Sequence, residues 1–293
     1  MSIPMNFICY QCHLRRTTEL AVPYADEASL GVLSKELMQL YLTFPEELSS
    51  PNLGPAAAVL LEKYAGLKPD RLRPEMDVSN AFMLARLEDI RCRIRDAEDP
   101  VYAALQFSVL GNYLDFAALQ GQVSFEKLDE MLDKALEMPL DKDCYANFRQ
   151  DLDRADRVLY LTDNAGEIVF DRVFAETLQA YWPKLQITFC VRGAPVHNDA
   201  LRQDAEAAGI TFPVIDSGSC IGGTELTRLG KEAAEAVERS DVIIAKGMGN
   251  TETLAGCGKN IYYAFLIKCP RFVQYFGKPM MTPMFVREKD INQ

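Results

Sequence analysis

The stretch RVLYLTDNAGEIVFD, residues 157–171, passes from an apolar run to acids, an amide and a glycine. Its first part, RVLYL, is typical of a buried strand, and the part from AGEIVF onward has the residue spacing of a helix. Asp163, Asn164 and Gly166 stand between the two parts. Such a polar exit from a strand is either a solvated loop or a site that holds a ligand.

The residues after this stretch repeat the same alternation. Three further apolar runs, each followed by a helical stretch or a polar loop, are QITFCV, TFPVI and DVIIAK. Strands that alternate with helices form βαβ units, which build a parallel sheet covered by helices. The run IYYAFLIKC at 261–269 is predicted as another strand or as a buried helix. We therefore predict an α/β fold with a Rossmann-like, three-layer α/β/α core.

The first half of the chain has a helical period instead. Apolar residues recur at three- and four-residue steps in EASLGVLSKELMQLYLTF, and VYAALQFSVLGNYLDFAAL is apolar on nearly every face. A helix that is apolar all round is normally buried. We predict two domains, a helical domain over 1–150 and a Rossmann-like domain that binds metal and phosphate over 151–293.

The bulk composition excludes several classes of protein. The 293 residues are 48% hydrophobic and carry a net charge of −11, which argues against a nucleic-acid partner because a phosphate backbone requires a clustered basic surface. No apolar stretch approaches the roughly 18–20 residues of a membrane-spanning helix, and the N-terminus lacks the order of a signal peptide. We expect a cytoplasmic protein with no membrane partner, whose eight cysteines are free thiols. The oligomeric state is not indicated.

The exits of the four strands carry the chemistry, because ligands bind beyond the carboxyl ends of an open parallel sheet. The first two exits contain Asp163, Asn164 and Asp199. Carboxylate and amide oxygens suit a hard divalent cation, whose other positions are usually filled by water and substrate phosphate oxygens. We predict that these three residues bind one such cation.

The same exits supply groups for an anion. Arg192 and Lys246 add positive charge, and the Ser217–Gly218 backbone stands near the start of a predicted helix, whose N-terminus favours an anion. A metal opposite such a cradle is what phosphoryl hydrolysis requires, so we predict Asp163 and Lys246 as catalytic. Glu167 is a candidate for orienting the attacking water.

Each of these residues also has a plain structural interpretation. Asn164 could be a turn former, Lys246 a simple strand exit, and Asp163 and Asp199 helix caps. Glu167 and Asp171 lie one helical turn apart, which is compatible with a solvent-facing pair. His197 is interpreted as a loop residue rather than as a base.

The segments LTDNAGEIVFD, VRGAPVHNDAL, DSGSCIGGT and DVIIAKGMGNTETL together resemble the damage-control phosphatase family. GNYLDF at 111–116 and the early CYQC are similar to its cysteine-bearing microbial branch. The resemblance implies a phosphatase that uses one divalent cation (Mn, Co, Ni or Mg). Its substrates would be small phosphorylated metabolites such as sugar phosphates, often damaged ones or side products.

The resemblance also assigns residues. The positions that match the family's metal ligands are Asp163, Asn164 and Asp199. The positions that match its substrate-binding loop are Lys246, Gly247 and Asn250. Asn112 and Asp115 belong to a recurring helical motif of this branch and are candidates to reach the site, the alternative being a buried, hydrogen-bonded helix pair.

Cys9 and Cys12 form a CxxC pair with three open interpretations. The pair could pack in the first helix, act as a redox thiol, or bind a second metal. A zinc ion would need two more ligands, for which His13, Cys257 and Cys269 are the candidates.

Two other functions remain open. One is an S-adenosylmethionine-dependent carboxyl methyltransferase, an activity that has been proposed for human relatives of the family. The strand exits do not favour it, because a methyl donor needs no divalent metal. The other is a non-catalytic protein that binds a metal and a phosphorylated metabolite.

Overall fold

A six-stranded sheet forms the centre of the molecule. A computed structural model describes residues 2–115 and 124–291, so Phe116 of the GNYLDF motif lies outside the described residues. The strand order is β3-β2-β1-β4-β5-β6. The strands are β1 (Arg157–Leu161), β2 (Gln186–Val191), β3 (Val214–Asp216), β4 (Val242–Lys246), β5 (Ile261–Leu266) and β6 (Pro283–Arg287).

The first five strands are parallel, and β6 runs antiparallel to β5 at one edge. The central strand β1 pairs with β2 on one side and with β4 on the other, so Leu161 stands opposite both Cys190 and Ala245. The chain order reverses between β1 and β4, which is where a doubly wound sheet opens a crevice for ligands. The predicted Rossmann-like α/β fold is confirmed, with β6 as an addition.

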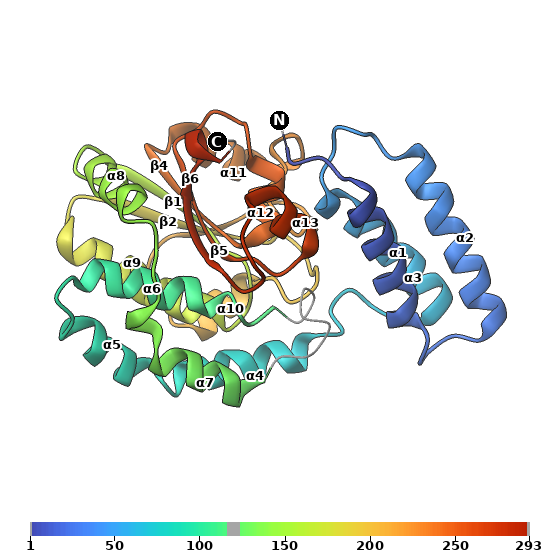
Figure 1. The fold of residues 1–293 in the computed structure, drawn as a ribbon, viewed down its shortest axis with the longest axis horizontal. Coiled ribbons are helices and arrows are strands. Elements are labelled where there is room, and N and C mark those ends of the chain that lie inside the picture. The colour runs from blue at the N-terminus through green and yellow to red at the C-terminus, as the bar shows by residue number, and fades with distance from the viewer. Residues whose placement is uncertain (1, 116–123, 292–293) are drawn as a thin grey trace.

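Helices surround the sheet (Figure 1). In chain order they are α1 (Phe7–Ala21), α2 (Glu27–Thr43), α3 (Gly54–Ala65), α4 (Arg73–Leu84), α5 (Leu87–Arg95), α6 (Pro100–Gly111), α7 (Phe125–Asp133), α8 (Lys142–Leu152), α9 (Glu167–Tyr181), α10 (Arg202–Ala207), α11 (Lys231–Arg239), α12 (Gly247–Leu254) and α13 (Pro270–Phe276). Short 3-10 turns lie at Ser50–Leu53, Ala135–Glu137, Leu226–Arg228 and Glu288–Asp290.

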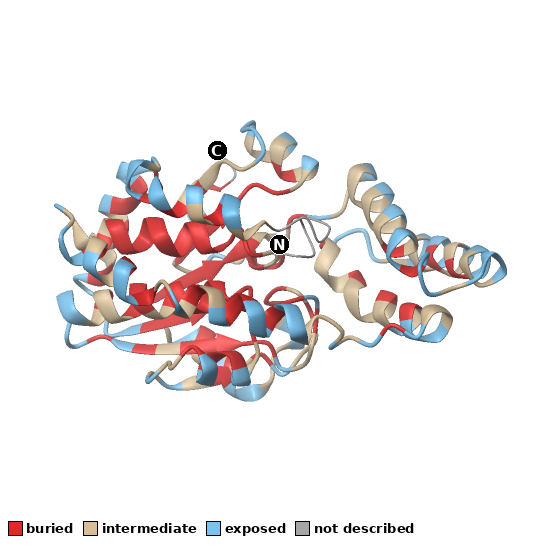
Figure 2. Ribbon diagram, turned by 90° about the horizontal axis from the view of Figure 1, so that it is seen from below, coloured by how far each residue is buried: buried red, intermediate tan, exposed pale blue. Residues whose placement is uncertain are grey.

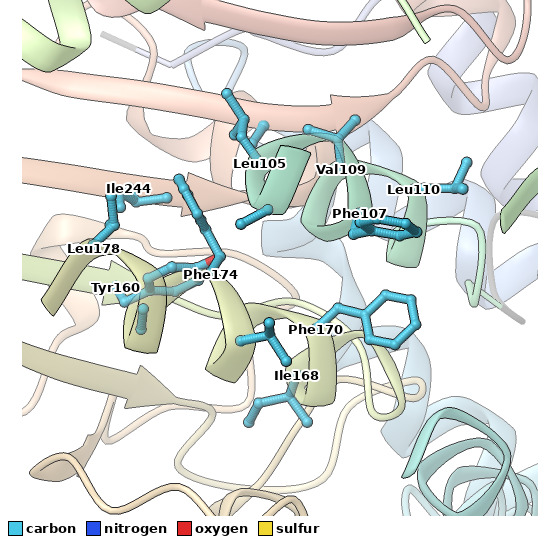
Figure 3. Close-up of a cluster of buried hydrophobic side chains, with 14 of the residues drawn as sticks. Leu105, Phe107, Val109, Leu110, Tyr160, Ile168, Phe170, Phe174, Leu178 and Ile244 are labelled. Atoms are coloured by element: carbon cyan, nitrogen blue, oxygen red, sulfur yellow. The ribbon is translucent and has the colours of Figure 1, made fainter. Parts of the chain in front are cut away.

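The apolar alternation of β1 explains the two faces of the core. Val158 and Tyr160 pack in the cluster that includes α6 and α9, whereas Leu159 and Leu161 pack in the cluster that includes α11 and α13. Figure 3 shows the first cluster, with α6 and α9 side chains meeting between the helices. Helix α6 is apolar all round because it lies between α9 and the sheet, and Asp99 caps its N-terminus at Val101 and Tyr102.

Helices α1, α2 and α3 stand apart from this core (Figure 1) and have a small cluster of their own. Its buried members among the described residues are Ala21, Leu33, Leu37, Ala57, Leu61 and Leu67. Most of their surface is intermediate or exposed, in contrast to the largely buried sheet (Figure 2). Helices α5, α6 and α8 share the large core with the sheet, and the domain boundary near residue 150 stays a prediction.

The segment before α1 returns to the sheet. Ile3 packs in the cluster around β4 and β5, and its backbone N–H donates to the Glu252 carbonyl at 2.8 Å. The Asn6 side chain caps α1 and donates to Gln274 at 3.1 Å. The helical unit α1–α3 is therefore anchored to the rest of the molecule through the segment that precedes α1. None of the described helices combines the length and apolarity needed to cross a bilayer.

Candidate active site at the strand ends

Two loops that follow neighbouring strands are joined by their backbones. Asn164, after β1, and Asp199, after β2, form an antiparallel bridge. Ala165 N–H donates to the Asn198 carbonyl at 2.9 Å, and Ala200 N–H donates to the Asp163 carbonyl at 2.7 Å. The three predicted metal ligands are thus brought together on one rigid pair of loops.

Asp163 is buried at the floor of a cleft. Its Oδ2 accepts hydrogen bonds from Asn112 Nδ2 at 2.9 Å and from Asn164 Nδ2 at 2.8 Å. Burial, followed by the negative charges of Asp199 and Glu167, raises its pKa well above the usual range. Its carboxylate therefore lies among like charges with little water around it.

Arg192 holds the second carboxylate. Its Nε donates to Asp199 Oδ2 at 2.6 Å, and its Nη2 donates to Asn250 Oδ1 at 3.3 Å. Burial raises the pKa of Asp199, and the Arg192 charge opposes that rise. Arg192 is buried behind the two carboxylates and does not line the cleft, so the structure does not place it where it would first meet a substrate.

Lys246 also lies behind the site. It is fully buried, and its ammonium contacts Glu167 Oε1 at 2.7 Å, Asp171 Oδ1 at 2.6 Å and both oxygens of Ser108 at 2.8 Å. These oxygens occupy its donors, and Lys246 is not among the cleft-lining residues. The expectation that Glu167 and Asp171 face solvent is wrong, because α6 covers this side of α9 and both carboxylates are completely buried.

Glu167 links this buried group to the cleft. Its Oε2 accepts from Asn112 Nδ2 at 2.9 Å and from Asn164 Nδ2 at 2.8 Å. Asn112 therefore reaches the site from the end of α6, bonding to both Asp163 and Glu167. Burial raises the pKa of Asp171 to about 6, against the lowering effect of the Lys246 charge.

Sequence reasoning missed one cation. Lys268, directly after β5, is buried and donates to the Asn112 carbonyl at 2.6 Å and to Asp115 at 2.7 Å. Its positive charge opposes the rise in the pKa of Asp163. Reading the exit of the run IYYAFLIKC as a strand exit would have found it.

The glycine-containing loops at the strand ends differ in whether they approach the Asp163 site. Gly247 has φ +78°, and a Cβ there would overlap the Asp163 carboxylate. Only glycine allows this approach between the start of α12 and Asp163. Ser217 Oγ accepts from Gly193 N–H and its own N–H donates to the Val191 carbonyl, whereas Gly218 N–H donates to Asp216 Oδ1 in the same loop. Neither Ser217 nor Gly218 lines the cleft. Asn250 is buried, donating to the Thr162 and Lys246 carbonyls.

A second network holds the Asp163 loop from the other side. Asn80 Oδ1, on α4, accepts from Gly166 N–H at 2.6 Å, and Asn80 Nδ2 donates to Asp204 at 2.7 Å. Asp204 is completely buried and pairs with Arg73 at 2.5 Å. Neither Asn80 nor Asp204 was singled out in the sequence, because no local pattern shows that they meet.

The cleft has a volume of about 1310 Å³ and lies between the strand ends and helices α1 and α3. Asp163, Asn164 and Asp199 line it on one side, and Cys9, Cys12, His13 and Arg16 of α1 line it on the other. This exceeds the roughly 300–1,000 Å³ of common ligand pockets. A ligand bound at the carboxylates would have room to extend toward α1.

Cys9 and Cys12 are free thiols at the cleft wall. Burial raises the pKa of Cys9, and it raises the pKa of the nearby Cys269 to about 12. His13 Nδ1 is engaged with the Tyr41 hydroxyl at 2.7 Å. The described residues contain no group of three or more His, Cys, Asp or Glu side chains placed to hold a metal ion. The roles predicted for the pair stay predictions.

The strand-end residues fit a hard cation by their chemistry. Among the described residues, the Oδ1 atoms of Asp163 and Asp199 receive no hydrogen bond, although each Oδ2 does. Both carboxylates line the cleft, so each has one oxygen available to a ligand. Two carboxylates and an adjacent amide form an all-oxygen set of the kind that Mg²⁺ and Mn²⁺ prefer.

Known proteins are similar to this chain in sequence. A damage-control phosphatase of Pyrococcus horikoshii is 30% identical over 244 residues, covering 81% of this chain and 83% of its own. A damage-control phosphatase of Archaeoglobus fulgidus is 31% identical over 188 residues, covering 63% and 64%. An uncharacterised protein of Methanocaldococcus jannaschii is 30% identical over 288 residues, covering 94% and 93%.

The fold and the family are shown by two further comparisons. The crystal structure of a DUF89 family protein from Pyrococcus horikoshii matches with a TM-score of 0.82 at 24% identity, covering 97% of this chain and 99% of that one. The ARMT1-like domain of damage-control phosphatases matches residues 8–282. The resemblance found in the sequence is confirmed, and the chain belongs to the ARMT1-like damage-control phosphatase family.

Proposed function

We propose that this protein is a metal-dependent phosphatase that hydrolyses phosphomonoesters of small metabolites, including sugar phosphates that are damaged or arise as side products. The observation that carries the proposal is the pair of buried carboxylates, Asp163 and Asp199, which line a large cleft and each keep one oxygen that accepts no hydrogen bond from the described residues. Membership of the family and the names of two relatives support the same reaction class.

Asp163, Asn164 and Asp199 would hold one divalent cation, with Mn, Co, Ni and Mg as the candidates. When bound, the cation supplies a Lewis acid that activates water and neutralises charge on the phosphoryl oxygens. The buried acids Asp163, Asp199 and Glu167 favour a bound positive charge in their midst.

The surrounding residues orient this set. Glu167 accepts hydrogen bonds from the amides of Asn112 and Asn164, and Lys246 holds Glu167 in turn. Arg192 fixes Asp199 in the same way. We assign Lys246 and Arg192 to positioning the metal-binding side chains, in place of the direct phosphate contact expected from the sequence.

The phosphoryl group would then meet the start of α12. Met248 and Gly249, in the first turn of this helix, line the cleft beside Asp163. First-turn N–H groups have no partner within a helix, and the helix dipole favours an anion there. Helices α1 and α3, across the cleft, would limit the access of bulk water to the leaving group.

The test is phosphate release from p-nitrophenyl phosphate and sugar phosphates, first without metal and then with each of the four cations. We expect metal-dependent release in the wild type and a loss of about 10³-fold or more in Asp163→Asn, because the variant loses the charge that binds the cation. Asp216→Asn is the control, since Asp216 ends β3 but lies outside this cleft.

Wild-type rates in Asp163→Asn would overturn the assignment. Absence of release under every cation, in folded protein, would favour one of the two alternatives. Saturable binding of S-adenosylmethionine would then support the methyltransferase. A thermal shift with metal and sugar phosphate, without turnover, would support a binding protein.

A further inference from the structure

Two arginines line the wall of the cleft that faces the strand ends. Arg16 lies on α1, and Arg71 lies just before α4. Both are half-buried. Neither side chain has a role in the proposed hydrolysis at the strand ends.

In the described part of the chain, these arginines differ from most others because no carboxylate oxygen lies within 4.0 Å of their side-chain nitrogens. Within the described residues, twelve of the arginines have a carboxylate oxygen within 4.0 Å, namely Arg15, Arg73, Arg86, Arg91, Arg93, Arg95, Arg149, Arg172, Arg192, Arg202, Arg239 and Arg287. The remaining six divide by position: Arg154, Arg157 and Arg228 are exposed, whereas Arg16, Arg71 and Arg271 are half-buried and line the cleft.

A half-buried guanidinium without a carboxylate loses hydration and gains no compensating charge. Burial lowers the pKa of Arg71 for this reason, and Tyr24 and Glu75 oppose that fall only in part. Within the described residues, its guanidinium makes one hydrogen bond to protein, a long one of 3.5 Å from Nη1 to the Lys68 carbonyl. An arginine in this condition is typical of a site that is completed by an anionic ligand.

The cleft places the two arginines and the carboxylates around one space, because Asp163 and Asp199 line it together with Arg16 and Arg71. His197, two residues before Asp199, lines the same cleft. Its ring packs over Gly222, where an added Cβ would stand 3.4 Å from His197 Cδ2. Arg271 belongs to another part of the cleft, where its charge acts on Glu252 and Cys9.

We propose that Arg16 and Arg71 form a second anion-binding subsite, which selects substrates whose leaving group carries a carboxylate or a second phosphate. The proposal rests on the proposed phosphatase function and names its substrate class. The cleft has room for both ends of such a molecule. The phosphoryl group lies at the strand ends, and the second anion lies at the arginines, away from the repulsion of Asp163 and Asp199.

The test compares three substrates with the same carbon skeleton. Glycerol 3-phosphate has no second anion, 3-phosphoglycerate adds a carboxylate, and 2,3-bisphosphoglycerate adds a carboxylate and a phosphate. We expect the wild type to have a kcat/KM about tenfold or more higher for the second or the third substrate than for the first. Which of the two is preferred identifies the anion.

The matched variants are Arg16→Ala/Arg71→Ala and the control Arg228→Ala, which removes an exposed arginine that likewise has no carboxylate partner among the described residues. We expect the double variant to lose the preference, so that the ratio of kcat/KM values falls about tenfold or more, while the control keeps the wild-type ratio. Arg16→Gln/Arg71→Gln replaces the alanine pair if the latter does not fold.

Equal ratios in the wild type and the double variant, with p-nitrophenyl phosphate still hydrolysed, would overturn the subsite and leave the phosphatase proposal standing. If no substrate releases phosphate, calorimetric titration with 3-phosphoglycerate and 2,3-bisphosphoglycerate decides instead. Binding that is weakened about tenfold or more in the double variant would support the subsite, and equal or absent binding would overturn it.

Discussion

The two sides of the cleft differ in the residues that support them. On the sheet side, Asp163 and Asp199 rest on a layer of buried partners that includes Glu167, Lys246 and Arg192. On the helical side, α1–α3 share a small apolar cluster and present Arg16 and His13 to the cleft. Under the function proposed above, the sheet would fix the position of the reacting groups, and the helices would recognise the group attached to the phosphate.

Lys246→Met would test this contrast most strongly. It leaves two completely buried carboxylates, Glu167 and Asp171, without their cation. We expect the free energy of unfolding to fall by about 3–5 kcal/mol. The control Lys63→Met breaks the solvent-exposed pair with Glu36 in the helical unit and should leave the free energy of unfolding nearly unchanged, because water screens the pair. Urea titration measures both values, and a loss below about 1 kcal/mol in Lys246→Met would contradict the buried pairing.

Gly247→Ala sharpens the claim that the sheet side fixes the chemistry. Its Cβ would displace the Asp163 carboxylate, and a displacement of this kind can cost about 10²-fold in kcat/KM. Gly258→Ala is the matched control, because its φ of +77° imposes similar backbone strain with nothing within 4 Å of the added Cβ. If both variants lose stability alike but only Gly247→Ala loses activity, the loss of activity comes from displacement of the Asp163 carboxylate. Similar activities of the two variants would contradict this explanation.

Leu37→Ala tests whether the helical unit can loosen by itself. Leu37 is completely buried in the small cluster of α1–α3, and its truncation should cost about 2–3 kcal/mol. We expect faster hydrogen exchange in α1–α3 and unchanged protection in β1 and β4. Leu42→Ala, on the same helix at 81% exposure, serves as the control. Uniformly faster exchange through the sheet would show that the two sides unfold together.

Glu252→Gln has the smallest expected effect. Burial raises the pKa of Glu252 from 4.5 to about 8, with the Arg271 charge opposing the rise. The folded protein keeps a proton that the unfolded chain releases, so stability should fall as the pH rises through this window, by at most about 1.4 kcal/mol per pH unit. Cys9 and Cys269, the titratable neighbours, stay protonated there because burial raises their pKa values.

The measurement is urea unfolding of the wild type and Glu252→Gln at several values between about pH 5 and about pH 8. Glu252 is half-buried, so we expect a slope below the one-proton maximum. The difference in stability between the two proteins should shift in favour of the variant as the pH rises. Parallel profiles would show that Glu252 ionises normally.

Most of the fold could be predicted because β1, β2 and β4 are short apolar runs separated by helices. Strand β6 (Pro283–Arg287) could not, since it begins with a proline, has polar flanks and pairs only with β5 at the sheet edge. The run at 261–269, predicted as a strand or a buried helix, contains β5, which pairs between β4 and β6. No local sequence pattern indicates this pairing.

The site was less predictable than the fold. Asp163, Asn164 and Asp199 stand at strand exits, where topology alone brings them together. The burial of Glu167 and Asp171 depends on α6, which covers their helix, and on Lys246, which lies at the end of β4, far from them in the sequence. The periodicity of a sequence predicts which residues share one face of a helix. It does not predict that another helix covers the polar face of that helix.

The anchoring of Ile3 has a consequence for the order of folding. Its hydrogen-bond partner, the Glu252 carbonyl, lies almost the whole chain away. During synthesis the residues around Ile3 emerge long before α12 exists, so the helical unit waits undocked until the last strands are made. Contacts of such high sequence separation form late and slowly. The cleft is accordingly among the last features of the molecule to assemble, and an incomplete chain would carry the α1 wall without the carboxylate site that it faces.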